Sequence, residues 1–203
     1  DLEHRDKLLS GSIEQIDAYR IRGYRNSEAW ARNQWVYFEM SFSEKITSVT
    51  QSPKQENGDR KAIISFENMS SNQLEVKVGI SFSSSEGAKR NLETEGKNLS
   101  FDKAKANAIA RWNDELNRIQ IEGGSDEQQK IFYSALYHTM MQPNTASDVD
   151  GRYRGMDQKI HQAEGFTYYT VFSLWDTFRA AHPLYTILYP ERTRDFIRTF
   201  LTM

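Results

Sequence analysis

The chain has 203 residues, of which 38% are hydrophobic and 27% charged, so it holds enough apolar material for a packed core. Its formal net charge of -2 gives no electrostatic basis for binding nucleic acid or an anionic membrane. It has no cysteine, which excludes disulfides and thiolate sites, and no apolar run of about 18 residues that would insert into a membrane.

Alternation of apolar and polar side chains characterises residues 1–84. Segment 35–42 has the period of a half-buried strand, and its apolar positions are Val36, Phe38, Met40 and Phe42. Segments 62–66 and 74–82 repeat the pattern, and the turn-rich stretches 51–59 and 68–72 separate the strands as in antiparallel hairpins. The sequence therefore predicts a sheet over this part of the chain.

The hydrophobic period changes after Ser85, and residues 85–123 are predicted to be linker helices. Ser100 is placed to cap a helix whose apolar stripe recurs every three or four residues. The stripe consists of Phe101, Ala104, Ala108, Trp112, Leu116 and Ile119. Gly123 and Gly124 are expected to end this connecting segment.

A second domain is predicted over residues 124–203. Ser125 and Gln128 have the spacing of a capping box before a further apolar stripe. A long ordered loop is expected over 144–166, followed by helices near 171–181 and over 190–203. Three helices cannot bury these stripes alone, so we expect the chain to be one piece of a larger protein, the end of an all-β domain joined to the opening helices of a helical domain.

The loop at 147–155 is the densest polar cluster in the chain. Asp148, Asp150 and Arg152 are close enough in sequence to hydrogen-bond a polyol. The Asp-x-Asp-Gly pattern also begins like a calcium loop, but Lys159 stands where an EF-hand requires glutamate. A salt-bridged structural turn explains the same residues equally well.

A second cluster, at 173–179, contains Trp175, Asp176 and Arg179. Sugars stack their C–H faces on aromatic rings and bind charged groups through their hydroxyls, so this combination suits a carbohydrate. On spacing alone, however, Asp176 and Arg179 are a surface i, i+3 pair and Trp175 belongs to a core. Neither interpretation is excluded by the residues themselves.

The remaining polar residues give weaker signals. His161 and His182 have no second histidine at i+3 or i+4, so metal-binding spacing is not supported, and His138 lies on an amphipathic helix, where a packed histidine is the simpler interpretation. No nucleophile-elbow pattern supports Ser-His-Asp catalysis. No catalytic and no metal-binding residue is therefore named.

Three ordered blocks of the sequence resemble the family-92 glycoside hydrolases, which are exo-acting, calcium-dependent α-mannosidases. The blocks are 132–139, 147–155 and 169–179, and upstream Ile21-Arg22-Gly23-Tyr24-Arg25 and Tyr37-Phe38 also fit. The resemblance covers essentially the entire chain. It implies a fold of the α+β class: the C-terminal part of an N-terminal β-sandwich domain (1–84), linker helices (85–123) and the truncated start of an (α/α)6 catalytic barrel (124–203).

The function implied by the resemblance is removal of terminal α-linked mannose from N-glycans or mannans with inversion of configuration. It also implies a secreted, periplasmic or cell-surface bacterial enzyme. A non-catalytic carbohydrate-binding or scaffold protein on the same fold is the alternative. The mannosidic linkage is left open, since residues that contact the next sugar are expected on other loops.

Inverting hydrolysis needs a carboxylic acid and a carboxylate base, and the family places both beyond Met203. Its calcium ligands are expected mainly there too. The resemblance therefore implies calcium in the full-length protein, none bound by this part alone, and a fragment that is inactive without the rest of its catalytic domain. It assigns Trp175, Asp176 and Arg179 to the terminal-mannose subsite, with Asp148, Asp150 and Arg152 as second candidates.

Overall fold

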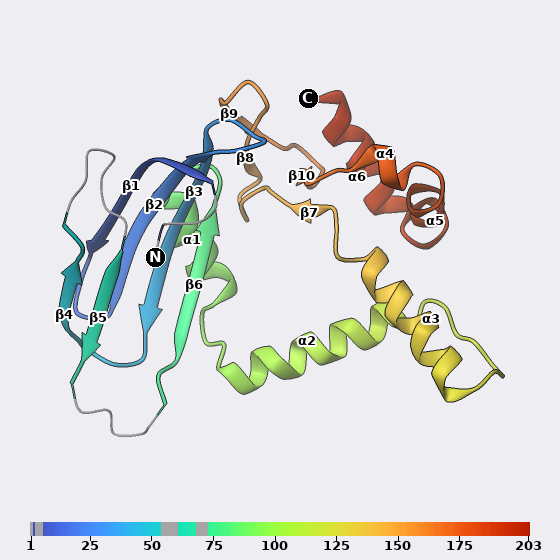
Figure 1. The fold of residues 1–203 in the computed structure, drawn as a ribbon, viewed down its shortest axis with the longest axis horizontal. Coiled ribbons are helices and arrows are strands. Elements are labelled where there is room, and N and C mark those ends of the chain that lie inside the picture. The colour runs from blue at the N-terminus through green and yellow to red at the C-terminus, as the bar shows by residue number, and fades with distance from the viewer. Residues whose placement is uncertain (1, 3–5, 54–60, 68–72) are drawn as a thin grey trace. The chain divides into compact units, whose positions relative to one another are not determined.

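The computed structural model describes residues 2, 6–53, 61–67 and 73–203 (Figure 1). The chain forms two compact units, each with its own apolar core. The N-terminal unit comprises Asp1–Asn98 and Ser147–Glu164, and the C-terminal unit comprises Leu99–Ala146 and Gly165–Met203. Across the described residues, no helix is long and apolar enough to cross a membrane.

The N-terminal unit is built on a four-stranded antiparallel sheet in the order β1-β2-β3-β6. Its strands are β1 (Lys7–Gln15), β2 (Arg20–Glu28), β3 (Gln34–Phe42) and β6 (Val76–Ser81). A separate ribbon pairs β4 (Ile46–Gln51) with β5 (Ala62–Phe66). The strands predicted over 35–42 and 62–66 are confirmed, and most of the predicted turns at 51–59 and 68–72 lie outside the described residues.

The apolar core of this unit lies between the four-stranded sheet and the β4–β5 ribbon. Ile13, Ile21 and Phe42 from the sheet are buried with Ile46 of the ribbon, each at most 8% exposed. Phe38, Met40, Val49, Ala62, Ile64, Phe66 and Leu74 pack around them. Two sheet layers enclosing one core form a sandwich, in agreement with the all-β prediction.

Helix α1 (Ser85–Glu95) covers the opposite face of the sheet, over β3 and β6 (Figure 1). The helix lies so close to Gly79 that a Cβ there would stand 2.4 Å from the carbonyl oxygen of Ala88. Ser81 is only 2% exposed on this face, whereas Val78 and Ile80 are each 52% exposed. Strand β6 therefore buries its small and polar side, which its apolar alternation did not indicate.

The contacts of two segments move the division between the units away from the predicted boundaries at 84 and 123. Helix α1 packs on the sheet, so residues 85–98 belong to the N-terminal unit rather than to a linker. Within the segment predicted as one long loop, β8 (Arg152–Arg154) and β9 (Ile160–Gln162) form a hairpin that joins the same unit. Strand β7 (Asn144–Thr145), at the start of the predicted loop, pairs with β10 (Tyr169–Thr170), just beyond its end, and both belong to the C-terminal unit.

The C-terminal unit begins with two capped helices. In α2 (Phe101–Leu116) the Ser100 hydroxyl accepts from the amide of Lys103, as predicted. In α3 (Asp126–Thr139) Ser125 and Gln128 form the predicted capping box. The helix expected over 171–181 is wrong in extent, because Val171 has a φ of 62° and only α4 (Leu174–Thr177) is helical before α5 begins at Ala181.

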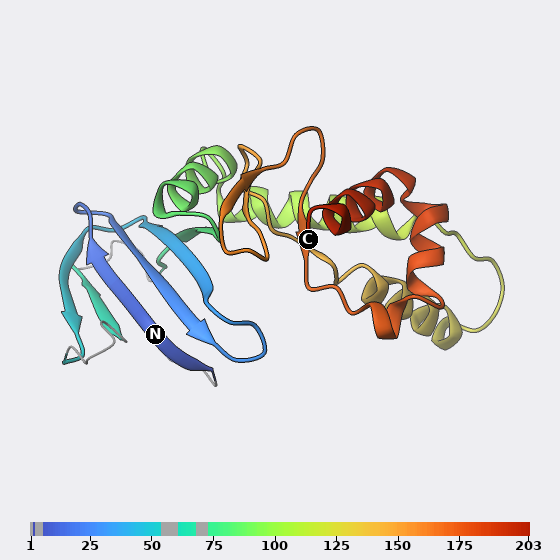
Figure 2. The same ribbon diagram turned by 90° about the horizontal axis from the view of Figure 1, so that it is seen from above.

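Helices α5 (Ala181–Leu188) and α6 (Pro190–Leu201) complete this unit, and the chain turns sharply between them (Figure 2). Tyr185, Tyr189 and Phe196 form its buried core, each at most 5% exposed. The core is mainly aromatic, and Phe172 and Tyr169 also pack edge-on against Phe196. Ile187 at 76% and Leu201 at 82% exposure lie on the uncovered sides of the same helices.

Candidate functional site

The segment 171–179 turns sharply before it presents its polar residues. Val171 has left-handed backbone geometry, which is a genuine outlier for a β-branched residue. The carbonyl oxygen of Ser173 then accepts from the amides of Asp176 and Thr177 at 3.1 Å and from the Thr177 hydroxyl at 2.8 Å. These bonds close the single turn of α4 around Ser173.

The side chains of this segment are displayed on the surface of the C-terminal unit. Trp175 is 90% exposed and therefore does not belong to the core of this unit. Asp176 is exposed and accepts a hydrogen bond from the hydroxyl of Ser173. The guanidinium of Arg179 lies 5.5 Å from the ring centre of Phe178, and within residues 73–203 no ion pair joins it to Asp176. The i, i+3 pair is therefore not formed, and both charged groups face solvent.

Asp148, in contrast, is buried in the N-terminal unit at 6% exposure. Its carboxylate accepts from the Ser81 hydroxyl at 2.8 Å and from the Asn91 amide nitrogen at 2.9 Å. Asn91 in turn accepts from the backbone amide of Val149 at 3.0 Å. This reciprocal pair attaches the 147–155 loop to β6 and α1.

The other charged residues of this loop are also engaged within the N-terminal unit. Asp150 forms an ion pair with Arg90, and the Nε of Arg152 lies 3.5 Å from the same carboxylate. The Nε of Arg154 donates to the carbonyl oxygen of Phe82 at 2.9 Å. The loop therefore has the contacts of a salt-bridged turn, the interpretation that the sequence left open.

The described residues do not provide a calcium site. Calcium prefers several oxygen ligands free of competing partners. Over residues 2, 6–53, 61–67 and 73–203, no group of three or more His, Asp or Glu side chains is placed to hold a metal ion. The Asp148 carboxylate accepts from a hydroxyl and an amide, and the Asp150 carboxylate is paired with an arginine. Within the part of the chain that the structure describes, these carboxylates therefore do not form a calcium site.

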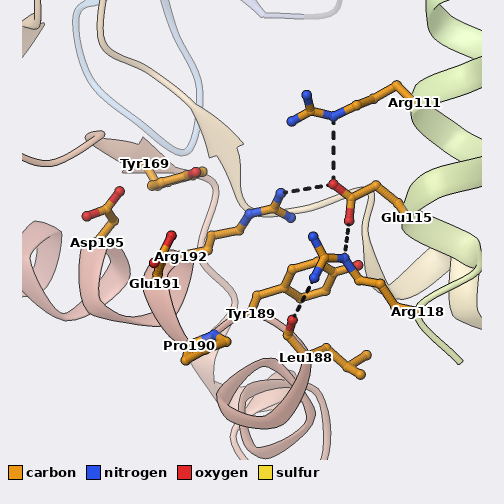
Figure 3. A pocket seen from close by; sticks show the side chains of 10 residues that line it. All are labelled: Arg111, Glu115, Arg118, Tyr169, Leu188, Tyr189, Pro190, Glu191, Arg192 and Asp195. Atoms are coloured by element: carbon orange, nitrogen blue, oxygen red, sulfur yellow. Dashed lines mark hydrogen bonds and ion pairs between the residues drawn. The ribbon is translucent and has the colours of Figure 1, made fainter.

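A cavity of about 430 Å³ lies within the C-terminal unit, beside the end of α2 and the start of α6 (Figure 3). It is lined by Arg111, Glu115, Arg118, Tyr169, Leu188, Tyr189, Pro190, Glu191, Arg192 and Asp195. Glu115 is its centre: the Nε of Arg118 donates to its carboxylate at 2.7 Å, and nitrogens of Arg111 and Arg192 lie at 3.7 and 3.9 Å. No local sequence pattern indicates this cluster, because its residues come from segments far apart in the chain.

Tyr189 is the buried aromatic residue of this cluster. The guanidinium carbons of Arg118 and Arg192 are 4.6 and 4.5 Å from its ring centre, within cation–π range. Burial and the Glu115 carboxylate raise the pKa of Tyr189 to about 12. Burial alone would raise the pKa of Glu115, but hydrogen bonds from Arg118 and Tyr189 outweigh it and lower that pKa. The acids that line this cavity balance its arginines, so the cluster has no formal net charge that would attract an ion. Its contacts connect the end of α2 with the end of α5 and the start of α6.

The comparisons with known proteins agree on one family. The model of the glycosyl hydrolase family 92 N-terminal domain matches residues 1–81, and that of the family 92 catalytic domain matches residues 87–203. An uncharacterized secreted glycosidase from Arthroderma benhamiae is 35% identical over 75 residues, which are 35% of this chain and 10% of that protein.

Solved structures of the family share the fold. The family GH92 α-mannosidase BT3965 from Bacteroides thetaiotaomicron matches 97% of this chain with 31% identity and a TM-score of 0.85. The inverting family GH92 mannosidase BT2199 from the same species matches 96% with 25% identity and a TM-score of 0.79.

This chain spans 28% of the first of these solved proteins and 29% of the second. Its antiparallel strands match the N-terminal sandwich, and its helices match the start of the catalytic domain, so the (α/α)6 barrel is only partly present. Because the two family models together match most of its length, the chain belongs to glycosyl hydrolase family 92.

Proposed function

We propose that the full-length protein containing this chain is an exo-acting α-mannosidase that removes terminal α-linked mannose from N-glycans or mannans with inversion. The observation that carries this proposal is the match to solved α-mannosidases over 97% of the chain at a TM-score of 0.85. One related structure holds mannoimidazole, and another related enzyme is described as inverting. Since fold alone does not imply activity, the proposal also needs a suitable site.

The part that this chain plays is sugar binding. We place Trp175, Asp176 and Arg179 at the terminal-mannose subsite. The exposed Trp175 ring offers a face for sugar C–H groups, and the Asp176 carboxylate accepts hydrogen bonds from sugar hydroxyls. The guanidinium of Arg179, which lies over the Phe178 ring, would donate hydrogen bonds to sugar oxygens.

The 147–155 loop has a supporting part in the proposal. Asp148 is buried and Asp150 is paired with Arg90, so their contacts favour holding the loop in place. Arg152 is exposed and remains the member of this group best placed to meet a glycan. We assign the general acid and the general base to other parts of the full-length protein, in line with the two carboxylates that inversion needs.

We further propose that the full-length enzyme requires calcium, bound by ligands outside the residues described, and that it acts outside the cytoplasm or at the cell surface. The secreted description of the Arthroderma relative supports the second point. Both statements depend on the family rather than on a site in this chain.

The proposal is tested by assaying the full-length protein on 4-nitrophenyl α-mannoside and on mannose disaccharides, with calcium and with chelator. Release of mannose that chelator abolishes and calcium restores is expected. Asp176→Ala should lower kcat/KM by about a hundredfold if its hydrogen bonds strengthen in the transition state. Asp114→Ala, which removes an exposed carboxylate from α2, is the matched control and should leave kcat/KM unchanged. A folded, calcium-loaded protein that releases no mannose would favour a non-catalytic carbohydrate-binding role.

A further inference from the structure

In the part of the chain that the structure describes, four serines stand immediately before helices, and the hydroxyl of one bonds differently from those of the other three. Ser84, Ser100 and Ser125 each accept, through the side-chain oxygen, a hydrogen bond from the backbone amide three residues later. This is the ordinary capping bond at a helix N-terminus. Ser173 also has an acid three residues later, as in a capping box, but it makes no side-chain capping bond.

The hydroxyl of Ser173 donates to the Asp176 carboxylate instead. The backbone explains this difference, because Ser173 has φ -124° and ψ 70° rather than the extended geometry of the other three serines. Its carbonyl oxygen, rather than its hydroxyl, receives the amides of the first turn. The hydroxyl is therefore free to act on the side chain of Asp176.

The residues before Ser173 fix this geometry. The ring centre of Phe172 lies 5.5 Å from that of Phe196 and 4.5 Å from that of Phe200, which anchors the segment in the core of the C-terminal unit. Val171, immediately before it, holds a φ of 62° that an isolated valine would avoid. Such strained positions persist where the surroundings impose them, and they cluster at binding sites.

The two oxygens of the Asp176 carboxylate consequently have different environments. One accepts from Ser173, while the other has no partner within residues 73–203 and lies in an exposed segment beside Trp175. We propose that Ser173 is a positioning residue that holds the Asp176 carboxylate in one orientation, so that its second oxygen accepts a hydroxyl of the bound sugar. This inference rests on the proposed function of Asp176.

Removing the Ser173 hydroxyl should therefore weaken catalysis without unfolding the protein. Loss of one hydrogen bond to a charged group corresponds to a fall in kcat/KM of about tenfold. Ser173→Thr keeps a hydroxyl at the same position and should retain kcat/KM within about threefold of the wild type. In an Asp176→Ala background, Ser173→Ala should cause no additional loss, because the group that it positions is gone.

The experiment compares the full-length wild type with Ser173→Ala, Ser173→Thr, Asp176→Ala and the double variant, using kcat and KM on 4-nitrophenyl α-mannoside. Ser125→Ala is the matched control, since it removes a true capping bond. It should lower the melting temperature and leave kcat/KM unchanged. Crystal structures of the wild type and Ser173→Ala then give the rotamer of Asp176 directly, which should be single in the first and spread over several in the second.

An unchanged Asp176 rotamer in Ser173→Ala would overturn the proposal, and so would an equal loss of kcat/KM from Ser173→Ala in the wild-type and Asp176→Ala backgrounds. If the full-length protein hydrolyses no α-mannoside, the proposed function fails, and the two crystal structures alone decide the role of Ser173. The two failures are thereby separated.

Discussion

Substitution of Asp148 is the sharpest test of how the polar cluster at 147–155 differs from the one at 173–179. Asp148→Ala would remove an acceptor that is 6% exposed and takes hydrogen bonds from Ser81 at 2.8 Å and Asn91 at 2.9 Å. A hydrogen bond to a charged group contributes about 1.5 to 3 kcal/mol, and the stranded donors add their desolvation cost. These losses overlap because both donors share one carboxylate. We therefore expect Asp148→Ala to lower the stability of the N-terminal unit by about 3 kcal/mol.

Asp148→Asn should be nearly as harmful although it is almost isosteric. One of its two terminal atoms becomes an NH2 donor facing Ser81 or Asn91, which already use donors there. The Ser81 oxygen cannot readily accept from it, because the amides of Ser83 and Ser84 already donate to that oxygen at 2.9 and 3.2 Å. The substitution therefore leaves a buried donor unpaired.

Hydrogen exchange of the full-length protein is the suitable assay, since a protein with several domains does not unfold in one step. A loss of about 3 kcal/mol would speed the exchange of amides in β6, α1 and the β8–β9 hairpin by roughly a hundredfold. Asp157→Ala, which changes an exposed carboxylate of the same hairpin, is the control and should leave β6 and α1 unaffected. If Asp148→Ala left exchange unchanged and instead raised KM for a mannoside, Asp148 would be a sugar ligand and the structural argument would be refuted.

Three further predictions concern ionisation and exposed surface. Burial raises the pKa of Glu39 above its ordinary value of 4.5, so the N-terminal unit should lose stability as the pH rises from 4.5 through the raised pKa. The melting temperature of Glu39→Gln should lack this dependence on pH. The lowered pKa of Glu115 has the opposite effect: its stabilisation is present above the ordinary value of 4.5 and is lost as pH falls through the lowered pKa. Glu115→Gln should therefore cost about 2 kcal/mol of stability near pH 7, measured by thermal melting, and much less once the pH has fallen through the lowered pKa. The 203-residue chain expressed alone should self-associate, because Phe101, Ile187 and Leu201 are 70 to 82% exposed, and a stable monomer in light scattering would contradict this.

Local patterns predicted the elements whose stability is local. The alternation in 35–42 and 62–66 identified β3 and β5, and the serines at 100 and 125 marked the starts of α2 and α3. Side-chain period and capping depend on residues within a few positions of one another, so a sequence contains this information directly.

Contacts between distant segments could not be predicted in this way. Nothing near Gly79 in the sequence indicates that α1 packs on it and buries the small and polar face of β6. The cluster of Glu115 from α2 with Tyr189 and Arg192 could not be predicted for the same reason, since its residues are far apart in the sequence. Helix propensity also failed at Val171, where packing of the adjacent Phe172 accompanies a backbone geometry that no helix contains.

The candidate site shows why residue type alone does not identify a ligand contact. Asp148 and Asp176 lie in clusters of similar composition, with arginine nearby, and for each of them a structural role is compatible with the sequence. In the folded chain Asp148 is buried and accepts from two side chains, so a sugar hydroxyl would have to displace bonds already made. Asp176 is exposed and accepts from Ser173 through one oxygen, while the other oxygen has no partner among the residues that the structure describes. The capacity to accept a further hydrogen bond at low cost, rather than the presence of a carboxylate, is what separates the proposed sugar ligand from the structural acid.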